Sequence, residues 1–236
     1  MGIKMKNQFL FGAKDGVPIA LGYFAVSFSF GMAAVAAGVP LWVSVALSAL
    51  NLTSAGQFSA LTLMAAGAPI AEIAVSTLVI NIRYLLMSLV LSQKLVKMSI
   101  FRRMAVAFGI TDEIFTVAST KPHKVGAAYM AGLIAVPYVG WAVGTLCGGA
   151  AGALMGEGAV SALGIGLYAM FIAIVLPAAK NSRAVAAASL AAVTIACVLK
   201  WVSIFDGLSD GWAIIIASVL SAAAAAVIFP RNEEDM

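Results

Sequence analysis

Residues 17–39 read VPIALGYFAVSFSFGMAAVAAGV, and this run decides the fold. Its 23 residues include no charged side chain. A helix needs about 20 predominantly apolar residues to cross a bilayer, whereas the apolar part of a signal peptide has only about 7–15 residues. We therefore interpret the run as the first membrane span and not as a signal peptide.

The composition of the whole chain agrees with that interpretation. Of its 236 residues, 63% are hydrophobic and 10% are charged, compared with about 45–50% and about 25% in soluble domains. So few charged side chains could not cover the surface of a soluble globule. The composition excludes an ordinary soluble enzyme, a disordered chain and a disulfide-stapled secreted module. It predicts an all-α polytopic membrane helix bundle that forms a single transmembrane domain over residues 1–236.

Six segments are long enough to cross the membrane. They are 17–39, 70–93, 125–148, 159–179, 184–200 and 212–229. Two further segments are interrupted, 41–67 by a polar stretch and 104–120 by two adjacent acids. Non-helical backbone at membrane depth is tolerated only where it is buried in protein or lines a cavity. We therefore interpret both as broken or re-entrant helices that lie near a binding site.

The distribution of basic residues favours six full spans over eight. Lys and Arg are enriched in cytoplasmic loops. If both interrupted segments return to the side that they entered from, 12 of the 14 basic residues lie inside, with Arg83 in the membrane and Lys200 outside. Eight crossings leave 8 inside, and seven spans remain an alternative. Six and eight spans both put the two termini in the cytoplasm. This topology explains the net charge of +4 without nucleic-acid binding, because the basic residues sit in short loops.

A stripe of glycines lies near the end of the third predicted span. Its members recur every four residues: Gly140, Gly144, Gly148, Gly152 and Gly156. On a helix they share one face, which lets another helix approach closely. The stripe suits a sliding or partner interface or static helix packing, and we favour static packing because this spacing is a general device of membrane helices.

Arg83 lies close to the middle of the 70–93 span. An arginine at that depth costs at least a few kcal/mol, and it normally faces the bundle interior with a partner. One interpretation is that Arg83 binds a substrate carboxylate through paired hydrogen bonds, with Asn81 supplying an amide at similar depth. The other is a structural ion pair with Asp112 or Glu113.

Asp112 and Glu113 are adjacent in a short apolar stretch. Successive side chains on a helix point about 100° apart, so the two acids cannot face one partner. One of them can pair with Arg83 while the other carries a proton, which carboxyl groups in apolar sites bind near neutral pH. Alternatively, Thr111 and Asp112 cap a helix that begins there, with Glu113 in its first turn. Both interpretations can hold together.

The stretch Asn51-Leu-Thr-Ser-Ala-Gly-Gln-Phe58 supplies further polar candidates. We expect Asn51 and Ser54 to share a helix face, and Gly56 to permit unwinding or close approach. Together with Gln57, these residues suit either the wall of a pocket for an amino or carboxyl group or hydrogen bonds between helices.

Other residues give weaker signals. We expect Glu72 to be a solvated residue near the outer end of its span, and Asp210 to cap the helix that starts near Trp212. Asp206 and Asp210 are too few for a calcium loop. The single histidine, His123, allows no histidine-based metal cluster or catalytic triad. No nucleotide-binding G-x-x-x-x-G-K-[ST] loop occurs. We therefore expect no enzyme, no cofactor, no metal and no ATPase.

These motifs resemble the AzlC family of branched-chain amino acid exporters. The resemblance rests on Ser54-Ala-Gly-Gln57, Asn81-Ile-Arg-Tyr84 and Thr111-Asp-Glu113, and it takes in Gly16-Val-Pro18, Trp141-Ala-Val-Gly144 and Tyr168-Ala-Met-Phe171. It spans roughly residues 10–180. The resemblance implies efflux of leucine, isoleucine, valine or methionine across a bacterial cytoplasmic membrane. It also implies a small membrane partner of the AzlD type.

Residues and resemblance together lead to one hypothesis. The chain is a proton-coupled exporter of apolar amino acids, in which Asp112 or Glu113 carries the proton. Five residues are the candidates for binding the amino acid: Arg83, Asn81, Asn51, Ser54 and Gln57. The competing hypothesis is a non-transporting scaffold or regulatory subunit whose intramembrane polar residues are only structural.

Overall fold

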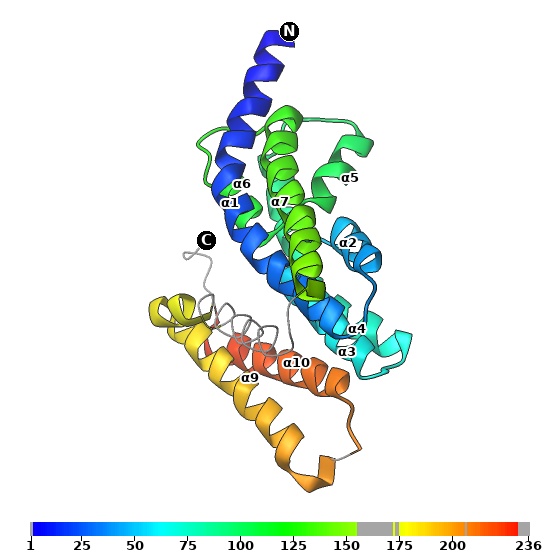
Figure 1. Cartoon of the computed structure of the whole chain (residues 1–236). Coiled ribbons are helices and arrows are strands. Elements are labelled where there is room, and N and C mark those ends of the chain that lie inside the picture. The colour runs from blue at the N-terminus through cyan, green and yellow to red at the C-terminus, as the bar shows by residue number, and fades with distance from the viewer. Residues whose placement is uncertain (1, 155–171, 173–174, 206, 231–236) are drawn as a thin grey trace. The chain divides into compact units, whose positions relative to one another are not determined.

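The computed structural model describes residues 2–154, 172, 175–205 and 207–230, and it is helical almost throughout them (Figure 1). Within those residues, five helices are long and apolar enough to cross a membrane. They are Asn7–Ala36 of α1 (Gly2–Ala36), α4 (Ile70–Lys94), Ala127–Gly152 of α7 (Ala127–Leu154), α9 (Arg183–Trp201) and α10 (Asp210–Ile228). The predicted all-α membrane fold is confirmed. Most of the remaining predicted span, 159–179, lies outside the described residues.

Both interrupted segments are broken helices. The first consists of α2 (Leu41–Leu50) and α3 (Ser54–Ala65), and the second of α5 (Ile100–Phe108) and α6 (Asp112–Ser119). Helix α2 ends because Asn51 has an extended backbone, with φ −138° and ψ 103°. Helix α6 begins at Thr111, whose Oγ1 accepts the N–H of Ile114 at 3.4 Å. The prediction that Asn51 and Ser54 share a helix face is therefore wrong, because the break separates them.

The chain divides into two compact units, and the division passes through α3 and α4. Unit 1 contains Met1–Gln57 and Asn81–Gly164, and unit 2 contains Phe58–Ile80 and Ile165–Met236. Every candidate binding or proton-carrying residue named above belongs to unit 1.

The glycine stripe joins α1 and α7, which lie side by side in unit 1 (Figure 1). Four glycines face α1 in order: Gly140 faces Ala20, Gly144 faces Phe24, Gly148 faces Phe28 and Gly152 faces Met32. A methyl group on Gly148 would lie 1.9 Å from the carbonyl oxygen of Phe28, so the two backbones can be this close only at glycine. The stripe is a packing surface between α1 and α7, and the matching order makes the two helices parallel. Gly156 lies outside the described residues.

Backbone pairing places the end of α4 beside the start of α7. The N–H of Val125 donates to the carbonyl oxygen of Lys94, and the N–H of Val96 donates to that of Val125, each at 3.0 Å. The chain between these paired residues contains α5 and α6. This broken helix therefore leaves and returns on one side of the membrane.

Within unit 1, α4 therefore runs in the direction opposite to α7 and to the parallel α1. The second broken helix is re-entrant, as the count of basic residues favours. Re-entry of the first broken helix, whose helix α3 lies mostly in unit 2, stays a prediction.

Apolar packing holds the second broken helix in unit 1. Leu91 of α4, Ile114 of α6 and Leu133 of α7 are fully buried in one cluster. Burying a side chain of this size contributes about 1.5–3 kcal/mol. Helix α6 has eight residues, too few for an isolated helix to be stable in water. Tertiary packing of this kind therefore stabilises it.

Unit 2 contains a buried carboxylate that caps a distant helix. Glu72, only 7% exposed, accepts the N–H of Gly211 at 3.0 Å and the hydroxyl of Ser209 at the start of α10. The prediction that Glu72 is solvated is therefore wrong. Asp210 does not cap α10 either: Ser209 occupies the cap position, and Asp210 pairs with Lys200 at 2.6 Å. Asp206 lies outside the described residues.

Candidate functional site

The two helix breaks meet at the middle of unit 1. Tyr23, Arg83 and Trp141 each lie within two residues, about 3 Å along the axis, of the centre of their membrane-spanning helix. The rings of Tyr23 and Trp141 pack edge to face, with their centroids 5.4 Å apart. Leu52, in the first break, belongs to the same buried cluster. Thr111, in the second break, lies 2.5 Å from the hydroxyl of Tyr23.

A charged group lies at the start of α6. Nη2 of Arg83 lies 2.9 Å from Oδ2 of Asp112. The hydroxyl of Tyr23 donates to Oε2 of Glu113 at 2.6 Å. The adjacent acids thus face different partners, as their 100° separation on a helix predicts. The expected cap at Thr111 and the expected ion pair of Arg83 are both present.

The ion pair is half-exposed. The side chains of Arg83 and Asp112 are 48% and 45% exposed. Arg83 also donates to the hydroxyl of Tyr84 at 3.4 Å and lies over its ring, 5.1 Å from the centroid. A guanidinium has five N–H donors in a planar fork that suits a carboxylate.

A second, uncharged group lies at the start of α3. Nδ2 of Asn81 donates to Oγ1 of Thr53 at 3.4 Å, and the hydroxyl of Thr53 donates to Oδ1 of Asn51. The amide of Asn81 packs on Gly56, where a methyl group would lie 2.5 Å from Nδ2, so the expected close approach at this glycine is present. Oδ1 of Asn81 is buried and has no hydrogen-bond partner among the described residues. It is an acceptor without a donor.

Gln57 is engaged within the protein. Its Oε1 accepts from Nε1 of Trp141 at 3.1 Å, and its Nε2 donates to Oγ of Ser48 at 2.6 Å. Ser48 in turn lies 2.7 Å from Oγ1 of Thr145. Gln57 is only 3% exposed. This buried network attaches the first turn of α3 to α2 and α7.

The structure therefore separates the predicted site residues into two groups. Arg83, Asp112 and Glu113 lie at the start of α6, whereas Asn81 and Asn51 lie at the start of α3 with Ser54 and Gln57. Asn81 and Arg83 are two residues apart on α4, so their side chains point about 160° apart. They share a depth, as predicted, but face different broken helices.

Tyr23 and Trp141 are the residues that the sequence analysis missed. Each connects a broken helix to the scaffold of α1 and α7, Tyr23 through Thr111 and Glu113, and Trp141 through Gln57. A weak signal was available, because a tyrosine or tryptophan at mid-membrane depth needs a partner for its polar atom. The partners themselves lie 84–90 residues away in the chain.

Comparison with known proteins supports the importance of this region. The model of the AzlC protein family matches residues 18–155, which include both breaks and all residues of both groups. The chain belongs to the AzlC family. This is a family of membrane transport proteins, so the resemblance found in the motifs is confirmed.

Relatives of this AzlC chain occur in bacteria and an archaeon. The Escherichia coli K12 protein named "Inner membrane protein YgaZ" is 32% identical over 200 residues, which cover 79% of this chain and 82% of the relative. An "Uncharacterized membrane protein" of Archaeoglobus fulgidus is 30% identical over 80% of this chain and 84% of its own length. One of Helicobacter pylori is 28% identical over 62% and 67%. No solved structure matches the chain.

Proposed function

We propose that this AzlC protein exports branched-chain and other apolar amino acids across the bacterial inner membrane as a proton-coupled secondary transporter. The implied activity of the family supports the substrate class, and the printed name of the Escherichia coli relative supports the membrane. The chain acts as a single transmembrane domain with both termini in the cytoplasm. A small subunit of the AzlD type accompanies it.

The observation that carries this proposal is the half-exposed ion pair of Arg83 and Asp112 at mid-membrane depth. An amino acid is a zwitterion, with one carboxylate and one ammonium group. When it binds, its carboxylate replaces Asp112 on Arg83, and its ammonium replaces Arg83 on Asp112. Every charge keeps a partner through this exchange, which avoids the cost of an unpaired charge in an apolar site.

Glu113 is the proton carrier in this proposal. It is not part of the ion pair, and it accepts a hydrogen bond from Tyr23 instead. Because Glu113 lies outside the ion pair, it can bind and release a proton without separating Arg83 from Asp112. The neighbouring acids therefore divide two tasks, with Asp112 holding the ammonium group and Glu113 exchanging the proton.

The uncharged group at the start of α3 forms the outer part of the path. In the topology that the basic residues favour, the second broken helix enters from the cytoplasmic side and the first from the opposite side, so we propose that an exported amino acid passes from the charged group to the uncharged one. There Oδ1 of Asn81, which is free among the described residues, accepts an N–H of the ammonium group. Asn51 and Ser54 line the path beside it, and Gln57 holds the start of α3 in place.

The test is transport of radiolabelled leucine by the purified chain in proteoliposomes, with and without a small AzlD-type subunit. Arg83→Ala abolishes transport, while the variant inserts and purifies as the wild type does. Arg103→Ala is the matched control, because this exposed arginine lies outside both groups, and it leaves transport unchanged. Transport at the wild-type rate by Arg83→Ala would refute the assignment. A panel of apolar amino acids then defines the substrate range.

The competing function, a scaffold or regulator without transport, predicts a different result for a charge exchange. The double variant Arg83→Asp with Asp112→Arg retains an ion pair. If the pair is only structural, the double variant recovers whatever activity of the complex the single variants lose. If Arg83 binds a carboxylate, the double variant folds but does not transport leucine. The positive and negative groups have then exchanged positions, so they no longer match the carboxylate and ammonium groups of the amino acid.

A further inference from the structure

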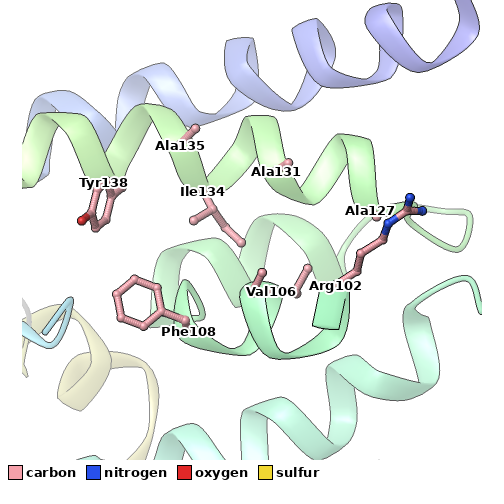
Figure 2. A pocket seen from close by; sticks show the side chains of 9 residues that line it. Arg102, Val106, Phe108, Ala127, Ala131, Ile134, Ala135 and Tyr138 are labelled. Carbon is pink, nitrogen blue, oxygen red and sulfur yellow. The ribbon is translucent and has the colours of Figure 1, made fainter. Parts of the chain in front are cut away.

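A groove of about 340 Å³ lies between α5 and α7, and no residue of the two groups described above lines it (Figure 2). Small and apolar side chains line most of it, among them Val106, Ala131 and Ile134. Arg102 lies at one end beside Ala127, and Phe108 and Tyr138 lie at the other (Figure 2). The groove is therefore long and apolar, with a single charge at one end.

The length of the groove matches one leaflet of a bilayer. Its lining on α7 runs from Ala127, the first residue of the helix, to Tyr138. Eleven residues at 1.5 Å each give about 16 Å, and half of a bilayer's hydrocarbon core is about 15 Å. The charged end lies where the chain emerges from the membrane, since Lys121, His123 and Lys124 immediately precede α7.

The charged end of the groove has no acidic partner among the described residues. Arg102 is exposed, and the described part of the chain gives it no salt bridge. Helix α5 begins with no acidic residue in its first turn, and the side chain of Ser99, its cap residue, makes no capping hydrogen bond. Helix α7 also begins without an acidic residue in its first turn. Two positive helix ends and a guanidinium thus lie together, an arrangement that favours an external anion.

We propose that this groove binds an anionic phospholipid, with the headgroup phosphate at Arg102 and one acyl chain along α7 as far as Tyr138. An acyl chain is apolar, narrow and one leaflet long, as the groove is. A partner's transmembrane helix fits less well, because it needs a contact surface that continues through about 30 Å and the groove ends halfway. Basic pockets between membrane helices bind anionic headgroups in this manner.

The test is binding of dioleoyl phosphatidylglycerol to the purified full chain, measured by native mass spectrometry and by thermal stabilisation in a neutral detergent. Dioleoyl phosphatidylcholine is the comparison lipid. Phosphatidylglycerol binds more tightly, and Arg102→Gln weakens it about fivefold, as expected for one basic residue at an anionic lipid surface. Arg103→Gln is the matched control: it is the adjacent exposed arginine, it does not line the groove, and it changes the affinity less than twofold.

A second variant tests the acyl chain. Ala131→Trp fills the middle of the groove and weakens binding of both lipids, whereas inorganic phosphate at the same concentration competes with neither. If Ala131→Trp does not fold, the comparison of Arg102→Gln with Arg103→Gln decides alone. Equal affinities for the two lipids, equal effects of the two arginine variants, or full competition by inorganic phosphate would each overturn the proposal. So would a membrane protein that copurifies with the wild type and is lost from a folded Ala131→Trp variant.

Discussion

The two broken helices have the same construction and opposite chemistry. Each is a helix interrupted by three residues, and each break contacts the aromatic pair of Tyr23 and Trp141. The first, α2 with α3, is neutral there, and its Gln57 is buried with its amide engaged by Trp141 and Ser48. The second, α5 with α6, carries two acids, one of which pairs with a half-exposed arginine.

This difference indicates separate roles for the two segments: the neutral one supports the structure, and the charged one takes part in transport. A buried, bonded amide stabilises the position of a helix, because leaving its partners unpaired is costly. A half-exposed ion pair at membrane depth is expensive to place there, and intramembrane charges of this kind mark functional sites by default. Its cost at membrane depth is therefore better explained by binding than by folding. The account expects the charged segment to control transport and the neutral one mainly to control stability.

The largest expected effect is in the charged segment. Asp112→Asn removes the partner of the ammonium group and leaves Arg83 unpaired, so leucine transport falls about 100-fold, which corresponds to about 3 kcal/mol for a truncated charge pair. The measurement is initial uptake into proteoliposomes. Asp210→Asn is the control, because it breaks the ion pair with Lys200 in unit 2 and leaves transport within twofold. Equal losses in the two variants would mean that ion pairs matter here only for folding.

The neutral segment gives the reverse pattern. Gln57→Leu leaves the N–H of Trp141 and the hydroxyl of Ser48 without this partner, and it destabilises the protein by about 2–3 kcal/mol. The folded fraction retains the wild-type KM for leucine. Thermal unfolding in detergent and transport kinetics measure the two quantities. The exposed Gln93→Leu serves as control and is expected to change stability by less than about 0.5 kcal/mol. A changed KM with normal stability would reverse the roles assigned to the two segments.

The aromatic pair offers a direct comparison between the segments. Tyr23→Phe and Trp141→Phe each remove one polar anchor and cost about 1–2 kcal/mol of stability. Tyr23→Phe also shifts the dependence of transport on pH, because it removes the hydrogen bond to Glu113, whereas Trp141→Phe does not. Rates of leucine transport measured over a series of pH values, for the wild type and both variants, provide the test. Identical pH profiles for both variants would remove Glu113 from the coupling mechanism.

The smallest expected effect is at the amide of α4. Asn81→Leu removes an acceptor that bonds the ammonium group only after the amino acid has left the ion pair. The KM for leucine therefore rises about threefold, less than the tenfold change that corresponds to 1.4 kcal/mol. The dependence on a proton gradient stays intact. Transport kinetics at two pH gradients measure both. A loss as large as that of Asp112→Asn would show that the uncharged group is the principal binding site.

Much of this architecture can be predicted from local patterns. Apolar length identifies the spans, and polar interruptions identify both breaks. The charges at membrane depth suggest an ion pair of Arg83 with Asp112 or Glu113, and the structure selects Asp112. The contacts of Tyr23, Trp141 and Glu72 cannot be predicted in this way, because their partners lie 84–139 residues away in the chain. Asn51 was misplaced for a related reason, since helical periodicity assumes a continuous helix and does not show at which residue it ends.

The most direct test of the account compares two transport modes of Glu113→Gln in proteoliposomes. Leucine counterflow requires only binding and release, whereas accumulation against a leucine gradient also requires the proton. The account predicts that Glu113→Gln retains counterflow near the wild-type rate and loses accumulation driven by a pH gradient, while Arg83→Ala loses both. Wild-type accumulation by Glu113→Gln, or loss of counterflow together with accumulation, would contradict the division of tasks between Asp112 and Glu113.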